Sequence, residues 1–251
     1  MDCLNFTAEA AWSTIKLTQN WTPTAVTLET STDKTTWTSY TIWDTITLAN
    51  VWDKIYMRNT STTDTWFSVD YSNCYQFVMT WSINWSWDIN YLLNKNSTTS
   101  LSSYCYVRLF MNCTSLTSSP ELPATTLWTS CYQHMFYWCT SLVNAPALPA
   151  TTLWNNCYQS MFVSCTLLSV LPKLPALTMP SACYNSMFNG CTKIKLSATK
   201  TWEYQTPYRI PTAWSWNSQN NSLNNMFYNT WWTFTWKPLR NTTYYTSNTV
   251  V

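Results

Sequence analysis

Residues 122–142 read Leu-Pro-Ala-Thr-Thr-Leu-Trp-Thr-Ser-Cys-Tyr-Gln-His-Met-Phe-Tyr-Trp-Cys-Thr-Ser-Leu, and this stretch is the fullest copy of a 26-residue repeat. Four columns keep that spacing through four units: Cys105, Cys131, Cys157 and Cys183; Cys113, Cys139, Cys165 and Cys191; Phe110, Phe136, Phe162 and Phe188; and Leu116, Leu142, Leu168 and Ile194. A fixed period of roughly 20–50 residues is the signature of repeat architectures. We therefore expect neighbouring units to stack and to share an interior lined by these columns.

Each unit predicts one helical segment and one extended arm. Leu127, Cys131, Met135 and Cys139 recur at every fourth position, which is typical of an apolar helix face. The position before the second cysteine holds Asn112, Trp138, Ser164 or Gly190, and a helix end there favours Gly or Asn in the left-handed conformation. The next residues, 142–149, predict a short extended arm with its prolines at the ends or edges of a ladder.

These motifs, in this order, resemble the BspA-like leucine-rich repeats of bacterial and phage surface proteins, over residues 97–199. The resemblance implies a solenoid with one short strand and one helical segment per unit, and it links the chain to attachment and host contact. The fourth unit lacks the Leu-Pro of the others. Because Met226-Phe227 follows Met187-Phe188 after 39 residues, residues 200–251 predict an interrupted last repeat and a C-terminal cap.

Residues 1–85 lack this period and show short alternating runs instead, namely Thr14–Leu17, Val26–Leu28, Ile46–Leu48, Ile55–Met57 and Tyr75–Val78. Runs about 10 residues apart with turn-like segments between them predict a small antiparallel β-sandwich. Residues 86–96 are expected to be a linker. The whole chain therefore predicts an α+β fold, in which a β-sandwich precedes a leucine-rich-repeat solenoid.

The composition contains an anomaly, because 251 residues include one Gly and 18 Trp. Ordinary usage of about 7% Gly would give roughly 18 glycines. Tryptophan also stands where glycine is expected: Asn20-Trp21 and Asn84-Trp85 resemble Asn-Gly turns, Trp85-Ser86-Trp87 and Trp214-Ser215-Trp216 resemble Gly-Ser-Gly linkers, and Trp231-Trp232 resembles a Gly-Gly turn. We therefore predict a source that reads UGA as glycine, and the alternative is a chain that is truly rich in tryptophan. Trp37 fits a genuine tryptophan beside the Asp33-Lys34 turn.

Little in the sequence favours an enzyme or a metal centre, and no cofactor or metal is expected. His134 is the sole histidine, Glu121 and Glu203 are the only acids after Asp88, and no phosphate-cradling glycine loop is visible. The eight cysteines of the repeat predict small buried residues rather than disulfides or zinc ligands. Cys3 and Cys74 leave open a bridge within the sandwich. The Tyr and Phe columns predict core packing more than a strip for stacking carbohydrate.

Charge and hydropathy also limit the partners. Residues 1–90 carry a net charge of −5 and residues 91–251 carry +7, but the basic side chains are scattered. A nucleic-acid site would need a dense basic stripe, so no nucleic-acid partner is expected. No apolar run is long enough to span a membrane, so no membrane insertion is expected, and no signal peptide is recognisable in this chain.

The expected function is that of a non-enzymatic binding or adhesion module at the cell surface or on a phage particle. Its partner would be a protein or glycan on a host or neighbouring cell. If the arms alternate inward and outward, the candidate contact face consists of Thr117, Ser119, Glu121, Val143, Ala145, Ser169, Leu171 and Lys173. The alternative is a structural spacer or virion component without a ligand of its own.

Overall fold

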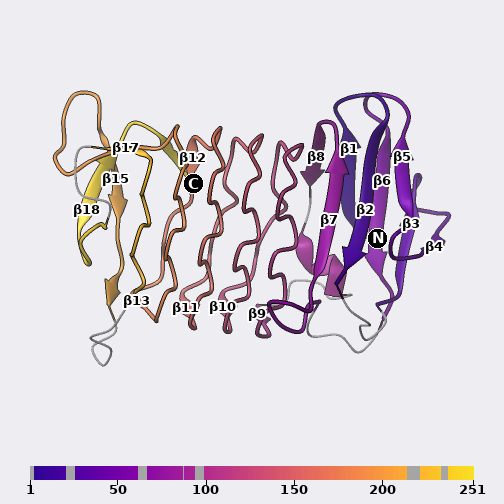
Figure 1. Cartoon of the computed structure of the whole chain (residues 1–251), viewed down its shortest axis with the longest axis horizontal. Helices are drawn as coiled ribbons and strands as arrows, with labels where there is room; N and C mark the ends of the chain where they lie inside the picture. Colours follow the sequence, from indigo (N-terminus) through magenta and orange to yellow (C-terminus); the bar gives the residue numbers. More distant parts are fainter. Residues whose placement is uncertain are drawn as a thin grey trace.

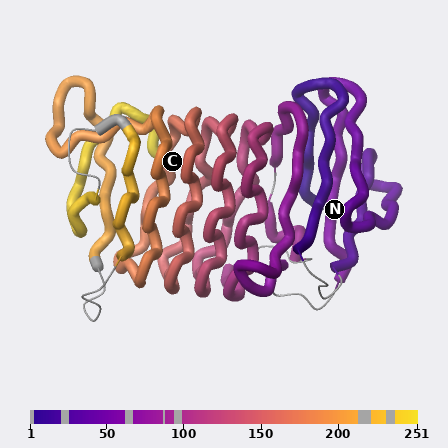
Figure 2. The backbone as a smooth tube through the Cα atoms, in the orientation of Figure 1, coloured from indigo at the N-terminus to yellow at the C-terminus, as the bar shows by residue number. Residues whose placement is uncertain are grey.

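The 26-residue units stack on one another as successive rungs, as the tube of Figure 2 shows. The computed structural model describes residues 3–20, 26–61, 67–86, 88–93, 99–213, 221–232 and 237–251. We number the rungs along the chain: rung 1 is residues 101–126, rung 2 is 127–152, rung 3 is 153–178 and rung 4 is 179–194. The stack forms the middle of an elongated molecule, with the N-terminal sheets at one end and the C-terminal strands at the other (Figure 1).

One side of each rung is held by two alternating sets of backbone hydrogen bonds. The amides of Tyr106, Arg108 and Phe110 donate to the carbonyls of Cys131, Gln133 and Met135 in the next rung, over 3.0, 3.0 and 2.9 Å. The residues between them, such as Leu109, donate to the carbonyl three residues earlier in the same rung. The same pattern recurs in rungs 2 and 3, so almost every amide on this side is satisfied.

The expected α+β fold, with a leucine-rich-repeat solenoid carrying a helical segment in each unit, is wrong. The described residues form strands, turns and one 3-10 segment, η1 (Ile89–Leu93), and contain no α-helix. Every fourth residue of the supposed helix is left-handed, with φ of 59°, 57° and 61° at Ser130, His134 and Trp138. An α-helix repeats every 3.6 residues, so it would rotate its face steadily away from a strict four-residue spacing. The spacing instead reflects consecutive turns, in which two buried residues alternate with two outer ones.

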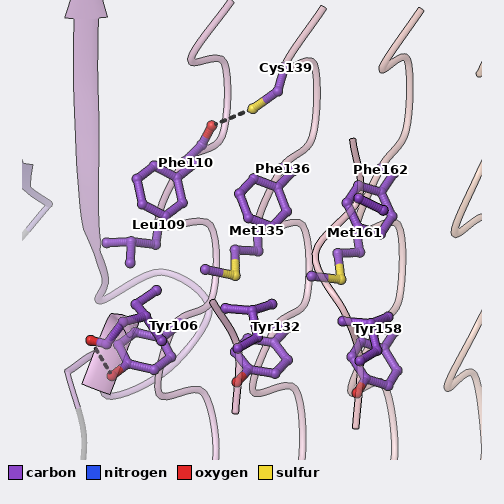
Figure 3. Close-up of a cluster of buried hydrophobic side chains, with 14 of the residues drawn as sticks. Tyr106, Leu109, Phe110, Tyr132, Met135, Phe136, Cys139, Tyr158, Met161 and Phe162 are labelled. Carbon is purple, nitrogen blue, oxygen red and sulfur yellow. Dashed lines mark hydrogen bonds between the residues drawn. The ribbon is translucent and has the colours of Figure 1, made fainter. Parts of the chain in front are cut away.

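Aromatic ladders fill the interior of the stack. The ring centroids of Phe110, Phe136, Phe162 and Phe188 lie 5.5–5.6 Å from the next, with interplanar angles of 2–6°. Tyr106, Tyr132, Tyr158 and Tyr184 form a second ladder with spacings of 5.7–6.1 Å, and both are buried. Figure 3 shows the two ladders side by side, with Met135 and Met161 between them. Burial of these rings confirms core packing for the aromatic columns, and carbohydrate stacking on them is excluded.

The cysteine columns connect neighbouring rungs. The thiols of Cys139, Cys165 and Cys191 donate to the carbonyls of Phe110, Phe136 and Phe162, with S···O distances of 3.0, 3.0 and 2.9 Å. Cys131 reaches the carbonyl of Ser102 in the same way, over 3.0 Å. The predicted burial of these residues is confirmed. Cysteine suits the position because it is a small apolar side chain with one weak donor.

The N-terminal part consists of two antiparallel sheets. One has the order β4-β3-β6-β1-β8 and the other β5-β2-β7. The strands of the first are β1 (Leu4–Ala8), β3 (Leu28–Ser31), β4 (Thr38–Tyr40), β6 (Lys54–Asn59) and β8 (Ile83–Ser86). Those of the second are β2 (Ser13–Gln19), β5 (Thr45–Leu48) and β7 (Tyr75–Thr80). Side chains such as Ile15 and Met57 are buried, and their neighbours along the same strand are more exposed.

The second N-terminal sheet contacts the stack directly through Phe77. Phe77 of β7 stacks on Phe110 at 5.4 Å and 10°, and its carbonyl accepts the thiol of Cys113 at 3.1 Å. The contacts of Phe77 are therefore those of the phenylalanine of a preceding rung. In the predicted linker, η1 buries Ile89, Leu92 and Leu93, and the carbonyl of Leu92 accepts a 2.8 Å bond from Asn59.

Short strands mark one edge of the rungs and the far end of the molecule. β9 (Ser100–Leu101), β10 (Thr126–Leu127) and β11 (Thr152–Leu153) form a parallel sheet where each rung begins, and β13 (Thr178–Met179) pairs with β16 (Thr212–Ala213). The four-stranded end sheet has the order β15-β18-β14-β17, from Thr206–Arg209, Thr243–Thr246, Lys195–Ser197 and Trp231–Trp232. Phe227 stacks on Phe188 at 5.5 Å, so residues 221–229 continue the phenylalanine ladder after the interruption of the repeat.

Two of the turns proposed from tryptophan positions are wrong. Asn84 and Trp85 lie within β8, and Trp231-Trp232 forms β17, which pairs with β14. Trp21, Trp87 and Trp214–Trp216 lie outside the described residues. Trp85 is buried against Phe6, Phe77 and Phe110, with centroid distances of 4.0, 5.3 and 4.7 Å. Local similarity to Asn-Gly therefore does not identify every turn.

Candidate binding face

The arms of the three complete rungs are residues 116–124, 142–150 and 168–176. A parallel bridge between Asn144 and Val170 and the bonds from the Ser169 and Ala145 amides to the Val143 and Val170 carbonyls hold the arms of rungs 2 and 3 side by side. Of the predicted contact residues, Glu121, Val143 and Lys173 are exposed, and Thr117, Ser119 and Ser169 are half-buried. Ala145 and Leu171 are buried. We call the outward column Thr117, Val143 and Ser169, together with the outward column Glu121, Ala147 and Lys173, the arm face.

The inward position of Ala145 and Leu171 follows from the prolines of the arm. Strict alternation would place the first, third and fifth residues of each arm outward, but the third residue is buried in rung 2 (Ala145) and in rung 3 (Leu171). Pro146 and Pro172, which come directly after the inward residues, are buried as well. Proline has a fixed φ and no amide to donate, so the arm departs from a regular strand, and two successive residues face inward.

Both ends of the arm face are partly covered. At rung 1, parallel bridges join Ile83 to Leu116 and Asp88 to Glu121, and the Thr117 hydroxyl donates to Glu9 over 2.8 Å. At rung 3, β12 (Val170–Leu171) pairs in parallel with β19 (Thr249–Val250), and the Lys173 amide donates to Val251 over 2.6 Å. The arm of rung 2 has neighbouring arms on each side and keeps Val143, Asn144 and Ala147 exposed.

Charge changes sign along the arm face. Glu121 lies at the sandwich end, Ala147 in the middle and Lys173 at the far end. Asp88 lies beside Glu121, and burial, followed by the charge of Glu121, raises the pKa of the Asp88 carboxyl. A ligand lying along the stack would therefore meet carboxylates at one end and an ammonium group at the other.

His134 lies on the turn side of rung 2 and not on a helix. Its ring packs edge-on to Tyr71 at 5.4 Å, and the guanidinium of Arg108 lies 5.0 Å from the centre of the same tyrosine ring. Burial, aided by the charge of Arg108, lowers the pKa of His134 to about 4. The imidazole is therefore neutral near pH 7, and its buried Nδ1 has no hydrogen-bond partner. It packs against Tyr71, which lies in the loop that precedes β7 of the sandwich.

The cysteines offer no reactive or metal-binding group at this face. All ten are buried and none is part of a disulfide, and burial raises the pKa of the Cys157 thiol to about 12. In the part of the chain that the structure describes, no three His, Cys, Asp or Glu side chains gather as a metal site requires. Among the same residues, no helix has the length and apolar character needed to span a membrane.

The buried thiols predict a loss of stability in alkali. They stay protonated in the folded chain, whereas unfolding returns them to an ordinary pKa near 9.0. The unfolded state therefore binds fewer protons than the folded state above that pH. The stability that the buried thiols contribute is fully present below about pH 9, and the free energy of unfolding falls as the pH rises toward the folded pKa. We expect the urea midpoint to be lower at about pH 10 than at about pH 7.5, and Cys157→Ala to make this fall shallower. A midpoint that stays constant over this range would contradict the burial of the thiols.

The sequence analysis missed Asn144 as an outward residue and the stacked pair of Trp128 and Trp154. These two rings lie 4.7 Å apart at 12° and are both partly exposed. The signal for the pair was present, because the two residues occupy one column of the 26-residue period.

The geometry of the arm face is the only guide to its ligand. The resemblance to BspA-like repeats remains a prediction based on the motifs. No family model matches the sequence, and neither a curated protein nor a solved structure was found to match the chain.

Proposed function

We propose that the chain is a non-enzymatic binding or adhesion module that contacts a protein or glycan through the arm face. The observation that supports this proposal is the contrast between the two sides of the repeat. The inward columns repeat Cys, Phe and Leu, whereas the outward columns change from unit to unit: Thr117, Val143 and Ser169 in one, and Glu121, Ala147 and Lys173 in the other. A constant interior with a varied exterior suits recognition on a rigid scaffold.

The chemistry of the face favours neutral, hydroxyl-rich or peptide ligands. Only 10% of the residues in the whole chain are charged, and the arm face has one carboxylate and one ammonium group on its two columns. A carbonyl, amide or sugar hydroxyl can bond to the side chains of Ser169 and of Asn144, which lies beside the arm face, while Val143 offers an apolar contact. We place this activity at a cell surface or on a virion, in line with the resemblance.

The test is an array of glycans and cell-surface proteins probed with the purified chain and two variants. Val143→Glu alters the centre of the arm face, and Leu167→Glu makes the same change at an exposed position outside it. The exposed fractions of the two native side chains are 40% and 46%, so the variants are well matched. We expect Val143→Glu to weaken binding by at least about tenfold, as for a central contact, and Leu167→Glu to leave it unchanged.

Two outcomes would contradict the proposal. Equal loss in both variants would place the contact elsewhere. Failure of the native chain to bind any arrayed molecule would favour the structural spacer or virion component, for which the stack sets only length and shape.

A further inference from the structure

Five exposed tryptophans lie in left-handed backbone. Trp12, Trp43, Trp52, Trp81 and Trp138 have φ values of 62°, 81°, 73°, 60° and 61°. At least half of each side chain is exposed. Glycine enters this region freely, whereas the Cβ of an L residue crowds the backbone there. Exposed rings gain little from packing that would offset this strain.

Four of these residues lie at bends between strands of the sandwich. Trp12 links β1 to β2, Trp43 links β4 to β5, Trp52 links β5 to β6, and Trp81 links β7 to β8. Among the described residues of the two sheets, only Lys34 shares the positive φ. Tryptophan therefore fills four of five such positions, which greatly exceeds its share of 18 in 251 residues.

The turn that contains Trp52 shows the backbone requirement directly. The amide of Asp53 donates to the carbonyl of Asn50 over 3.2 Å and closes a four-residue turn with Trp52 at its third position. A turn whose third residue has a positive φ requires glycine or asparagine at that residue. The Trp52 amide also donates to the carbonyl of Ala8 over 2.8 Å, so the conformation is fixed by the sheet.

Trp138 occupies a column in which the other residues are small or amide-bearing. Asn112, Ser164, Gly190 and Asn229 share its place in the ladder and its left-handed backbone, with φ of 65°, 59°, 77° and 57°. A Cβ added to Gly190 would lie 3.1 Å from Ser164 Oγ of the preceding rung. The column thus includes the one glycine of the chain and two asparagines, which after glycine are among the residues that enter this conformation most readily.

Two other residues, Trp85 and Trp37, fit their positions as tryptophan and not as glycine. Trp85 has no positive φ and is buried among three aromatic rings, although its Nε1 lacks a hydrogen-bond partner. Trp37 donates from Nε1 to the carbonyl of Lys34 over 3.2 Å, and the guanidinium of Arg58 lies 3.9 Å from its ring centre. These two rings make contacts that only a large aromatic side chain provides.

We infer that glycine is the native residue at Trp12, Trp43, Trp52, Trp81 and Trp138, and that the codon at each is UGA, which the source decodes as glycine. The left-handed backbone and the exposed side chains identify these five residues, and the excess of tryptophan over glycine in the composition agrees with the inference. Trp85 and Trp37 are assigned as tryptophan.

The identity of the residues is tested by peptide mass spectrometry on the protein isolated from its source, together with the codons of its gene. We expect glycine masses and UGA at the five positions. A tryptophan mass or a UGG codon at these positions would overturn the inference.

The physical basis is tested by single substitutions in the chain as printed. Trp52→Gly and Trp81→Gly are expected to raise the urea midpoint of unfolding. Trp202→Gly is the matched control, because its ring is 88% exposed but its φ is not positive, and it should not raise the midpoint. Trp85→Gly should lower the midpoint strongly. Equal effects of Trp52→Gly and Trp202→Gly would show that loss of an exposed ring, and not relief of backbone strain, is responsible, and would contradict the inference.

Discussion

Phe136→Ala is expected to destabilise the chain by about 3–5 kcal/mol, the range for removing a buried phenylalanine from a packed core. Phe136 is fully buried in the middle of its ladder, with rings 5.5 Å away on one side and 5.6 Å away on the other. Its removal leaves a cavity that neither neighbouring rung can close without breaking the backbone bonds between them. Denaturant unfolding followed by circular dichroism measures the change.

The control for this prediction is Val143→Ala on the same rung. The valine side chain is 40% exposed, so its truncation should change the free energy of unfolding by no more than about 0.5 kcal/mol. If the two variants lose similar stability, the ladder is not the core of the stack.

Phe77→Ala is expected to cause a loss of similar size, about 3–5 kcal/mol, and to lower the stability of the sandwich and the rungs together. Phe77 contacts Phe6 and Trp85 within the sandwich and Phe110 in rung 1, at 5.4, 5.3 and 5.4 Å. A residue shared by two cores couples their unfolding. Hydrogen exchange of the β2 and β7 amides and the reactivity of the rung thiols, both followed by peptide mass spectrometry, report on the two parts separately.

Val78→Ala is the matched control in the same strand, because the Val78 side chain is 45% exposed. We expect one transition seen by both probes in the native chain and in Phe77→Ala. Separate transitions, with the thiols of the rungs unaffected by Phe77→Ala, would show that the two parts fold independently.

The sequence predicts which side chains form the core of the stack, but it does not predict the conformation of the backbone that holds them. The Cys, Phe and Leu columns are buried as their spacing predicts, and most of the alternating runs of the N-terminal part fall within β2, β5, β6 and β7. The helix prediction failed because spacings of four and of 3.6 residues cannot be separated over three turns by apolar pattern alone. The left-handed backbone at Arg108, His134, Ser160 and Ser186 separates these turns from a helix, but the amino acids at the four positions share no preference that could have revealed it.

The arm face was predictable in part for a related reason. Thr117, Glu121, Val143, Ser169 and Lys173 face outward at least partly, but the inward turn of Ala145 and Leu171 depends on how the buried prolines bend the arm. Contacts with Glu9 and Val251 come from opposite ends of the chain. No local pattern could reveal that these segments cover the ends of the face.

The near-identity of the rung interfaces has a consequence for how such a chain changes over generations. Rung 2 offers rung 3 the same Phe, Tyr and Cys groups that rung 1 offers rung 2. A gene rearrangement that removed or duplicated residues 127–152 in frame would therefore join surfaces that already fit. The distance between the N-terminal sheets and the C-terminal strands is then set in whole steps, and length can evolve without redesign of either end.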